Sequence, residues 1–130
     1  MSDSLYVRSR DEAMPLVAVL SRKLDPGVDL VMAFDRAGEL GVAVPLDPGT
    51  TLTEVVELMT AIALPGEQLL LVSNRTGEDP ADRPSDEFDW EEMSGIARAN
   101  DVVLLDWFVT WGTTAFSLAE FAPTPAAWAR

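Results

Sequence analysis

The chain has 130 residues, of which 48% are hydrophobic, and its 22 acidic and 9 basic residues give a formal net charge of −13. This length predicts one domain with a packed core, and the charge disfavours nucleic acid, whose phosphates are held by Lys and Arg. No apolar run approaches the ~20 residues of a membrane helix, and no signal-peptide pattern opens the chain. We therefore expect a cytoplasmic protein that binds neither nucleic acid nor membrane.

The sequence contains no His and no Cys. These residues supply the usual zinc ligands, the thiolate nucleophile and the commonest general base near neutral pH. We therefore expect no metal and no cofactor, and any cation would have to be a hard one held by carboxylates.

The first half of the chain predicts a helix, a β-hairpin and a second helix. A capping box, Ser-x-x-Glu, precedes the helix predicted over residues 11–23. Apolar and β-branched runs at 28–34 and 39–45, joined by a Gly-containing turn, predict the hairpin. A second capping box, Thr-x-x-Glu, opens a helix from residue 51 to about 63.

The second half predicts a strand, a helix and two further strands. The apolar run at 68–73 is followed by a polar loop, a helix at 85–99 and strands at 102–109 and 114–118. Residues 5–7 are a further candidate edge strand. On or beside the three helices, the apolar residues expected to face the core are Met14, Val17, Ala18, Leu24, Val55, Leu58, Met59, Ile62, Met93 and Ile96.

This order of elements predicts a single α/β domain with three layers, in which helices cover both faces of one mixed β-sheet. The domain is expected over residues 1–121. Residues 122–130 are rich in Pro and Ala and predict a loosely packed tail or an arm that contacts a partner.

The stretch Leu69–Asp89 organises the chain, because a buried strand there delivers a polar loop onto the start of a helix. It contains Ser73-Asn74-Arg75-Thr76-Gly77 and, after a spacer, Pro84-Ser85-Asp86-Glu87-Phe88-Asp89. This pattern resembles the metal-site motif of RadC-like JAB/MPN metalloprotease-like domains, roughly H-x-H-P-S-G followed by P-S-x-x-D.

The resemblance covers about residues 9–121. Val31-Met32-Ala33-Phe34-Asp35 and Pro48-Gly49-Thr50 stand where the family has a strand ending in Asp and a small-Gly-Thr segment. Leu104-Leu105-Asp106-Trp107-Phe108-Val109 is similar to the family's L-L-D-H-x-I run, with Trp107 in place of His. Phe116-Ser117-Leu118 matches the strand ending in Ser.

The departures from the family fall on its chemistry. The positions of the zinc-binding histidines are Ser73 and Arg75. The third ligand, an Asp, falls on Phe88, between two Asp residues. The catalytic Glu falls on Gly27, with Asp29 the nearest carboxylate. The resemblance therefore implies a degenerate pocket without metal or catalytic residues, and its candidate residues are Ser73, Arg75, Ser85, Asp86 and Asp89.

Two interpretations of this pocket stay open. In one, Arg75 pairs with Asp86 or Asp89 and replaces the metal or binds an anion. In the other, these are solvated charges of a surface loop, where ion pairs contribute only ~0–1 kcal/mol. Trp is enriched in binding hot spots, so Trp90, Trp107 and Trp111 are candidates for contact with a partner, although a small domain buries most of its Trp residues.

We therefore predict a catalytically inactive RadC-like JAB/MPN domain that acts as a protein-interaction or regulatory module. Its partner would be a protein, basic in view of the charge of −13, or a second copy of the chain. One alternative is a hydrolase that uses Asp86, Asp89 and Arg75 without zinc. Another is an acidic decoy that binds a basic protein by imitating the charge of nucleic acid.

Overall fold

The fold is described from a computed structural model, which covers residues 5–47, 51–63, 66–75, 86–111, 114–120 and 128. Its core is a five-stranded sheet in the order β2-β1-β3-β4-β5. The strands are β1 (Asp29–Phe34), β2 (Leu40–Leu46), β3 (Gln68–Asn74), β4 (Val103–Trp111) and β5 (Thr114–Ser117). Only β3 and β4 pair in parallel, and the three other pairings are antiparallel. The expectation of a mixed sheet is therefore confirmed.

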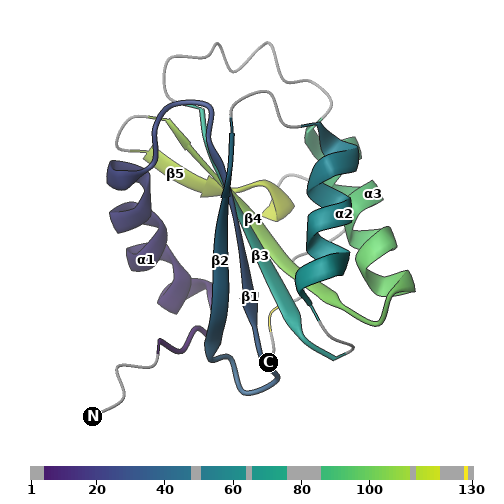
Figure 1. Cartoon of the computed structure of the whole chain (residues 1–130). Coiled ribbons are helices and arrows are strands. Elements are labelled where there is room, and N and C mark those ends of the chain that lie inside the picture. Colours follow the sequence, from purple (N-terminus) through teal and green to yellow (C-terminus); the bar gives the residue numbers. More distant parts are fainter. Residues whose placement is uncertain are drawn as a thin grey trace.

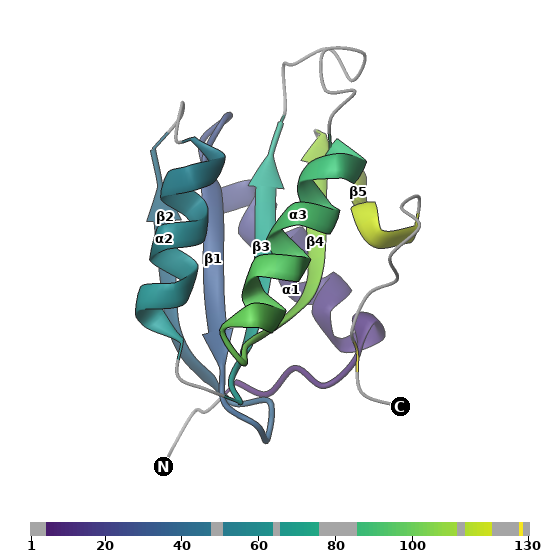
Figure 2. The same ribbon diagram turned by 90° about the vertical axis from the view of Figure 1, so that its right-hand side faces the viewer.

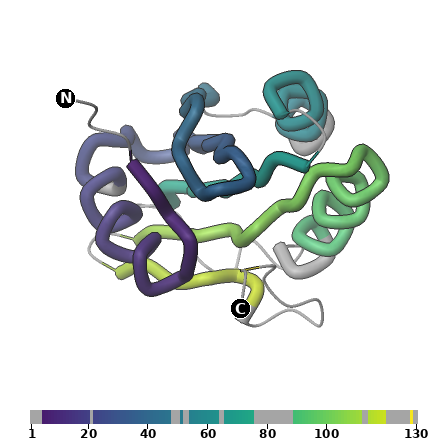
Figure 3. Tube along the Cα trace, turned by 90° about the horizontal axis from the view of Figure 1, so that it is seen from below, coloured from purple at the N-terminus to yellow at the C-terminus, as the bar shows by residue number. Residues whose placement is uncertain are grey.

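Helices cover both faces of this sheet, as the order of elements predicts. Helix α1 (Arg10–Lys23) lies on one face, whereas α2 (Leu52–Ile62) and α3 (Asp86–Ala99) lie on the other (Figures 1 and 2). The view along the strands from below shows the same three layers (Figure 3). A single α/β domain is thus observed, with a short 3₁₀ turn, Leu118–Glu120, after β5.

At both predicted helix starts, the hydroxyl of the N-cap residue makes the hydrogen bond that the capping box predicts. The Ser9 hydroxyl accepts a hydrogen bond from the backbone N–H of Glu12 at 3.2 Å. The Thr51 hydroxyl accepts one from the N–H of Glu54 at 3.3 Å. Each cap satisfies an N–H group that the first turn of a helix leaves without a partner, so local sequence alone determines where α1 and α2 begin.

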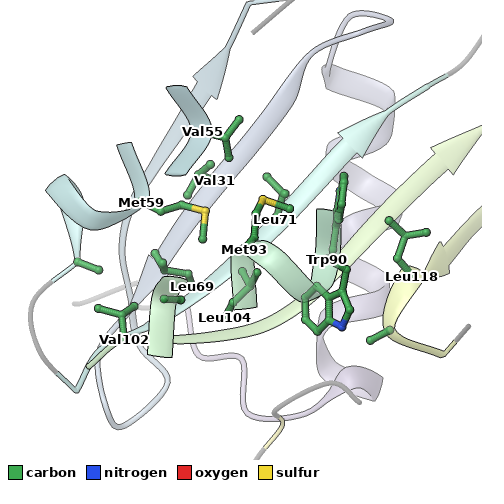
Figure 4. Packing of buried hydrophobic residues seen from close by; sticks show 14 of the residues in the cluster. Val31, Val55, Met59, Leu69, Leu71, Trp90, Met93, Val102, Leu104 and Leu118 are labelled. Atoms are coloured by element: carbon green, nitrogen blue, oxygen red, sulfur yellow. The ribbon is translucent and has the colours of Figure 1, made fainter. Parts of the chain in front are cut away.

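The apolar core is divided into two layers by the sheet. Alternate strand residues such as Val31, Leu69 and Leu71 face α2 and α3, where Met59 and Met93 pack over them (Figure 4). Their neighbours in sequence face α1 and form the second layer, which contains Val17, Leu30, Met32, Phe34, Leu70, Val72, Leu105 and Phe108. Each central strand is apolar on both sides because both of its faces are covered.

Two of the predicted inward positions are wrong or only partly right. Ala18 is exposed, because the buried stripe of α1 runs through Ala13 and Val17 at i, i+4 spacing. On α3, Ile96 is only half-buried, and Ala97 packs against the sheet in its place. The predicted strand at residues 5–7 is reduced to a single bridge between Tyr6 and Glu39.

Candidate functional site

The parallel pair β3 and β4 ends at the edge of the sheet where α3 begins, as Figure 2 shows. The carboxyl ends of parallel strands commonly form sites, because strand ends and a helix N-terminus converge there. The last residues of β3, Ser73 and Asn74, and the following Arg75 lie at this edge and are all buried. Three residues near the end of β3, of which Ser73 and Arg75 are predicted pocket residues, thus lie together at this end of the sheet.

The buried residues at this edge form a cluster of Ser73, Trp107 and Arg75. The indole N–H of Trp107 donates a hydrogen bond of 2.8 Å to the Ser73 hydroxyl. The guanidinium carbon of Arg75 lies 5.3 Å from the centre of the Trp107 ring, in the range of a cation–π interaction. Only 5% of Arg75 is exposed. The interpretation of Arg75 as a solvated surface charge therefore does not describe this residue.

The backbone around this cluster is held by both neighbouring strands. The N–H of Arg75 donates to the Thr110 carbonyl of β4 at 2.8 Å, and the N–H of Gly27 donates to the Asn74 carbonyl at 2.7 Å. Gly27 has a φ of 86°, a conformation that glycine adopts without strain. Asp29 is paired with Ser73 across β1 and β3. Gly27 and Asp29, which the resemblance singled out, are thus both next to the end of β3.

The remaining predicted pocket residues are placed less completely. Ser85 and the rest of the loop at 76–85 lie outside the described residues, and Asp86 is the first residue of α3 with its side chain not described. Asp89 is half-buried in the first turn of α3. The ion pair of Arg75 with Asp86 or Asp89 stays a prediction.

The three candidate tryptophans are packed against the core. Trp90 is fully buried and Trp107 nearly so, so neither presents its ring to a partner. Trp111 is half-buried at the end of β4 and stacks on Phe116, with ring centres 5.3 Å apart. Among the residues that the structure describes, its buried Nε1 finds no acceptor. Of the three, Trp111 is the one that is partly exposed, although its Nε1 is buried.

A second polar site, which sequence reasoning did not single out, is centred on Asp106. This carboxylate is fully buried in the middle of β4. Its Oδ1 accepts hydrogen bonds from the Ser117 hydroxyl at 2.5 Å and the Trp107 N–H at 2.8 Å. Its Oδ2 accepts from Arg10 Nε at 3.2 Å and Trp128 Nε1 at 2.8 Å. The signal was a lone Asp inside the apolar run 102–109, because a buried charge requires donors.

A bulge in β4 determines the face on which Asp106 lies. Leu69 is paired with Leu104, and the next residue of β3, Leu70, is paired with Asp106, so Leu105 is the extra residue. Asp106 therefore shares the α1 face with Leu70, whereas Trp107 lies on the opposite face. Two consecutive residues of β4 thus serve two separate buried polar clusters.

Among the described side chains, no three Asp or Glu residues are grouped closely enough to hold a metal ion. No helix in the described part of the chain combines the length and apolar character needed to cross a membrane. No protein-family model matches the chain, and no curated protein matches it significantly. The class of the protein therefore follows from its fold, which is a three-layer α/β domain with a mixed sheet.

Proposed function

We propose that the chain is a degenerate RadC-like JAB/MPN domain, without zinc or peptidase activity, which acts as a protein-interaction or regulatory module. The observation that carries this proposal is the contact of Ser73, Arg75 and Trp107 with one another. These are the three positions at which the resemblance places histidine. Residues that are 34 positions apart in sequence are expected to meet in this way if the frame is that of the family.

A second contact supports the same frame. Asp106 and Ser117 belong to the two carboxyl-terminal runs that carry the resemblance, and the Ser117 hydroxyl donates to Asp106 at 2.5 Å. These runs come from different strands, β4 and β5, which are paired antiparallel. The contact is independent of the histidine positions, so it supports the proposal separately.

The chemistry of the cluster favours binding over catalysis. If the frame is that of the family, the Arg75 guanidinium takes the region of the metal cation, and its positive charge opposes a cation there. Ser73 is buried and its hydroxyl already accepts the Trp107 N–H, and the chain has no His to act as its base. With these groups used for packing, the exposed surface carries the function.

The exposed surface indicates a basic partner. On the face that α2 and α3 cover, Glu54 and Glu57 of α2 and Glu91 and Glu92 of α3 are all exposed. Together with the net charge of −13, they attract positively charged proteins and accelerate association. A basic protein partner is therefore the interaction that this surface fits best.

The proposal is tested by rebuilding the metal site. The double variant Ser73→His/Arg75→His places a His-x-His pair at the end of β3. If the frame is that of a JAB/MPN domain, the folded variant should bind about one zinc per chain, measured by elemental analysis after dialysis, whereas the original protein should bind none. A folded variant that binds no zinc would overturn the assignment.

A matched control is available on the edge strand. Val42 and Val44 have the same i, i+2 spacing on β2 and face the same side of the sheet as Val31 and Ala33, their partners on β1. The variant Val42→His/Val44→His therefore carries a His-x-His pair away from the candidate site. It should bind zinc much more weakly than the site variant, and equal affinity would show that any such pair suffices.

An assay of the original protein distinguishes an interaction module from a hydrolase. A carboxylate hydrolase would cleave ester or peptide substrates, and Asp89→Asn would abolish that cleavage. We expect that neither the original protein nor the Asp89→Asn variant cleaves these substrates above the uncatalysed rate. Cleavage that Asp89→Asn removes would replace the proposal by the enzymatic alternative.

A further inference from the structure

The strongest feature outside the candidate pocket is the Asp106 site on the α1 face. Buried carboxylates are costly unless donors surround them. Within the sheet, Oδ1 is satisfied by Ser117 and by the adjacent backbone. The other oxygen, Oδ2, is satisfied by side chains from outside the sheet, Arg10 at the start of α1 and Trp128 near the C-terminus.

Trp128 makes two kinds of contact in this site. Its indole N–H donates to Asp106 Oδ2 at 2.8 Å, and its ring packs against the apolar layer beneath α1. The side chain of Arg10, which bonds the same oxygen, is 33% exposed, and Trp128 itself is half-buried. The two partners of Oδ2 are therefore partly exposed, whereas Asp106 and Ser117 are buried.

We propose that this site is a specific binding site for an indole, and that its occupant is the C-terminal segment of the same chain, held reversibly through Trp128. An apolar surface with a carboxylate oxygen at its base fits a flat ring with one N–H donor, as in Trp. Phe matches the ring but leaves Oδ2 without one of its donors, and such a loss is costly when the acceptor is buried.

Occupation by the same chain is favoured by tethering. A segment joined to its site has an effective concentration on the order of millimolar, which exceeds the concentration of a second copy in dilute solution. The site lies on the face opposite to the Ser73, Trp107 and Arg75 cluster. The inference therefore does not rest on the proposed function, and its failure would leave that proposal unchanged.

The test empties the site and refills it from outside. The full-length variant Trp128→Ala is titrated with a peptide of the sequence of residues 123–130, PTPAAWAR, and binding is followed by NMR shifts of the Ser117 and Trp107 amides. We expect about millimolar affinity for the variant and at least about tenfold weaker binding to the original protein, whose site is occupied. Equal binding to both proteins, or no binding to the variant, would overturn the inference.

Two controls test the specificity for the N–H group. The same peptide with 1-methyltryptophan, which cannot donate, should bind the variant about tenfold more weakly, because Oδ2 then lacks this donor. If Trp128→Ala does not fold, Trp128→Phe serves as the recipient, and the peptide should displace its phenyl ring. Equal binding of the methylated peptide to the recipient would refute recognition through the N–H.

The oligomeric state identifies the source of the indole. With the tail bound within its own chain, sedimentation of the original protein should show a monomer whose mass does not change when Trp128 is replaced. A dimer that dissociates in Trp128→Ala would show that the tail binds a second copy, and would overturn the assignment to the same chain.

Discussion

The two faces of β4 solve the same physical problem in different ways. On the α2 and α3 side, the Arg75 guanidinium lies over the Trp107 ring, and the indole N–H of Trp107 donates a hydrogen bond to the Ser73 hydroxyl. On the α1 side, Asp106 is surrounded by four donors among the described residues. A cation is thus held by an aromatic ring at the end of a strand, and an anion by hydrogen bonds in its middle.

The different positions of the two clusters in the sheet indicate how strongly substitutions in each should affect stability. The first cluster lies at the carboxyl ends of the strands, where sites are built and residues can change without disturbing the centre of the sheet. The second joins α1, β4, β5 and Trp128, so its loss would leave several buried donors unpaired at once. We therefore expect substitutions in the Asp106 cluster on the α1 side to lower the free energy of unfolding more than substitutions in the Ser73, Trp107 and Arg75 cluster on the α2 and α3 side.

The largest expected effect is that of Asp106→Ala. Removing the carboxylate takes the acceptor of the buried Ser117 hydroxyl and of the Trp107 backbone N–H, and each buried donor left unsatisfied costs about 1–3 kcal/mol. The measurement is the free energy of unfolding in urea. Glu57→Ala, at an exposed carboxylate on α2, is the matched control and should stay within about 0.5 kcal/mol. A loss below about 1 kcal/mol for Asp106→Ala would contradict the comparison.

Arg75→Ala should have the next largest effect. The guanidinium is buried against Trp107, and its removal should lower the free energy of unfolding by about 1–3 kcal/mol. Arg75→Lys should recover only part of this loss, because an ammonium cannot stack as a planar guanidinium does. Arg98→Ala, at an exposed position of α3, should change stability little. Equal small losses for Arg75→Ala and Arg98→Ala would show that the buried position contributes nothing.

A smaller effect is expected for the hydrogen bond between Ser73 and Trp107. A double-mutant cycle with Ser73→Ala and Trp107→Phe isolates it from the packing that each change also alters. The coupling energy, obtained from urea unfolding of the four proteins, should be about 0.5–1.5 kcal/mol. A coupling energy of zero would mean that the bond at 2.8 Å adds no stability.

The smallest expected effect is that of a chelator. Because the chain has no imidazole and no thiolate, its thermal midpoint should not change when a zinc chelator is added, and elemental analysis should find no stoichiometric zinc. The zinc-loaded Ser73→His/Arg75→His variant is the positive control, whose midpoint should fall. If the chelator lowered the thermal midpoint of the original protein, the interpretation that the protein binds no metal would be wrong.

The sequence alone determined the elements, because their signals are local. Capping boxes, apolar periodicity and Gly-containing turns predicted the helices and strands to within about two residues, and the position of the polar loop after β3 predicted which edge would hold Ser73 and Arg75. The mixed sheet covered on both faces followed from the order of these elements.

Only the tertiary structure decided which side chains meet. The bulge at Leu105 shifts the register of β4 by one residue, and a one-residue shift changes the face of the sheet that a side chain occupies. It thereby placed Asp106 beside Arg10 and Ser117. The contact of Trp107 with Ser73 spans 34 positions, and that of Asp106 with Arg10 spans 96. No local propensity encodes such distances, since they arise only when the sheet forms and its two faces are covered.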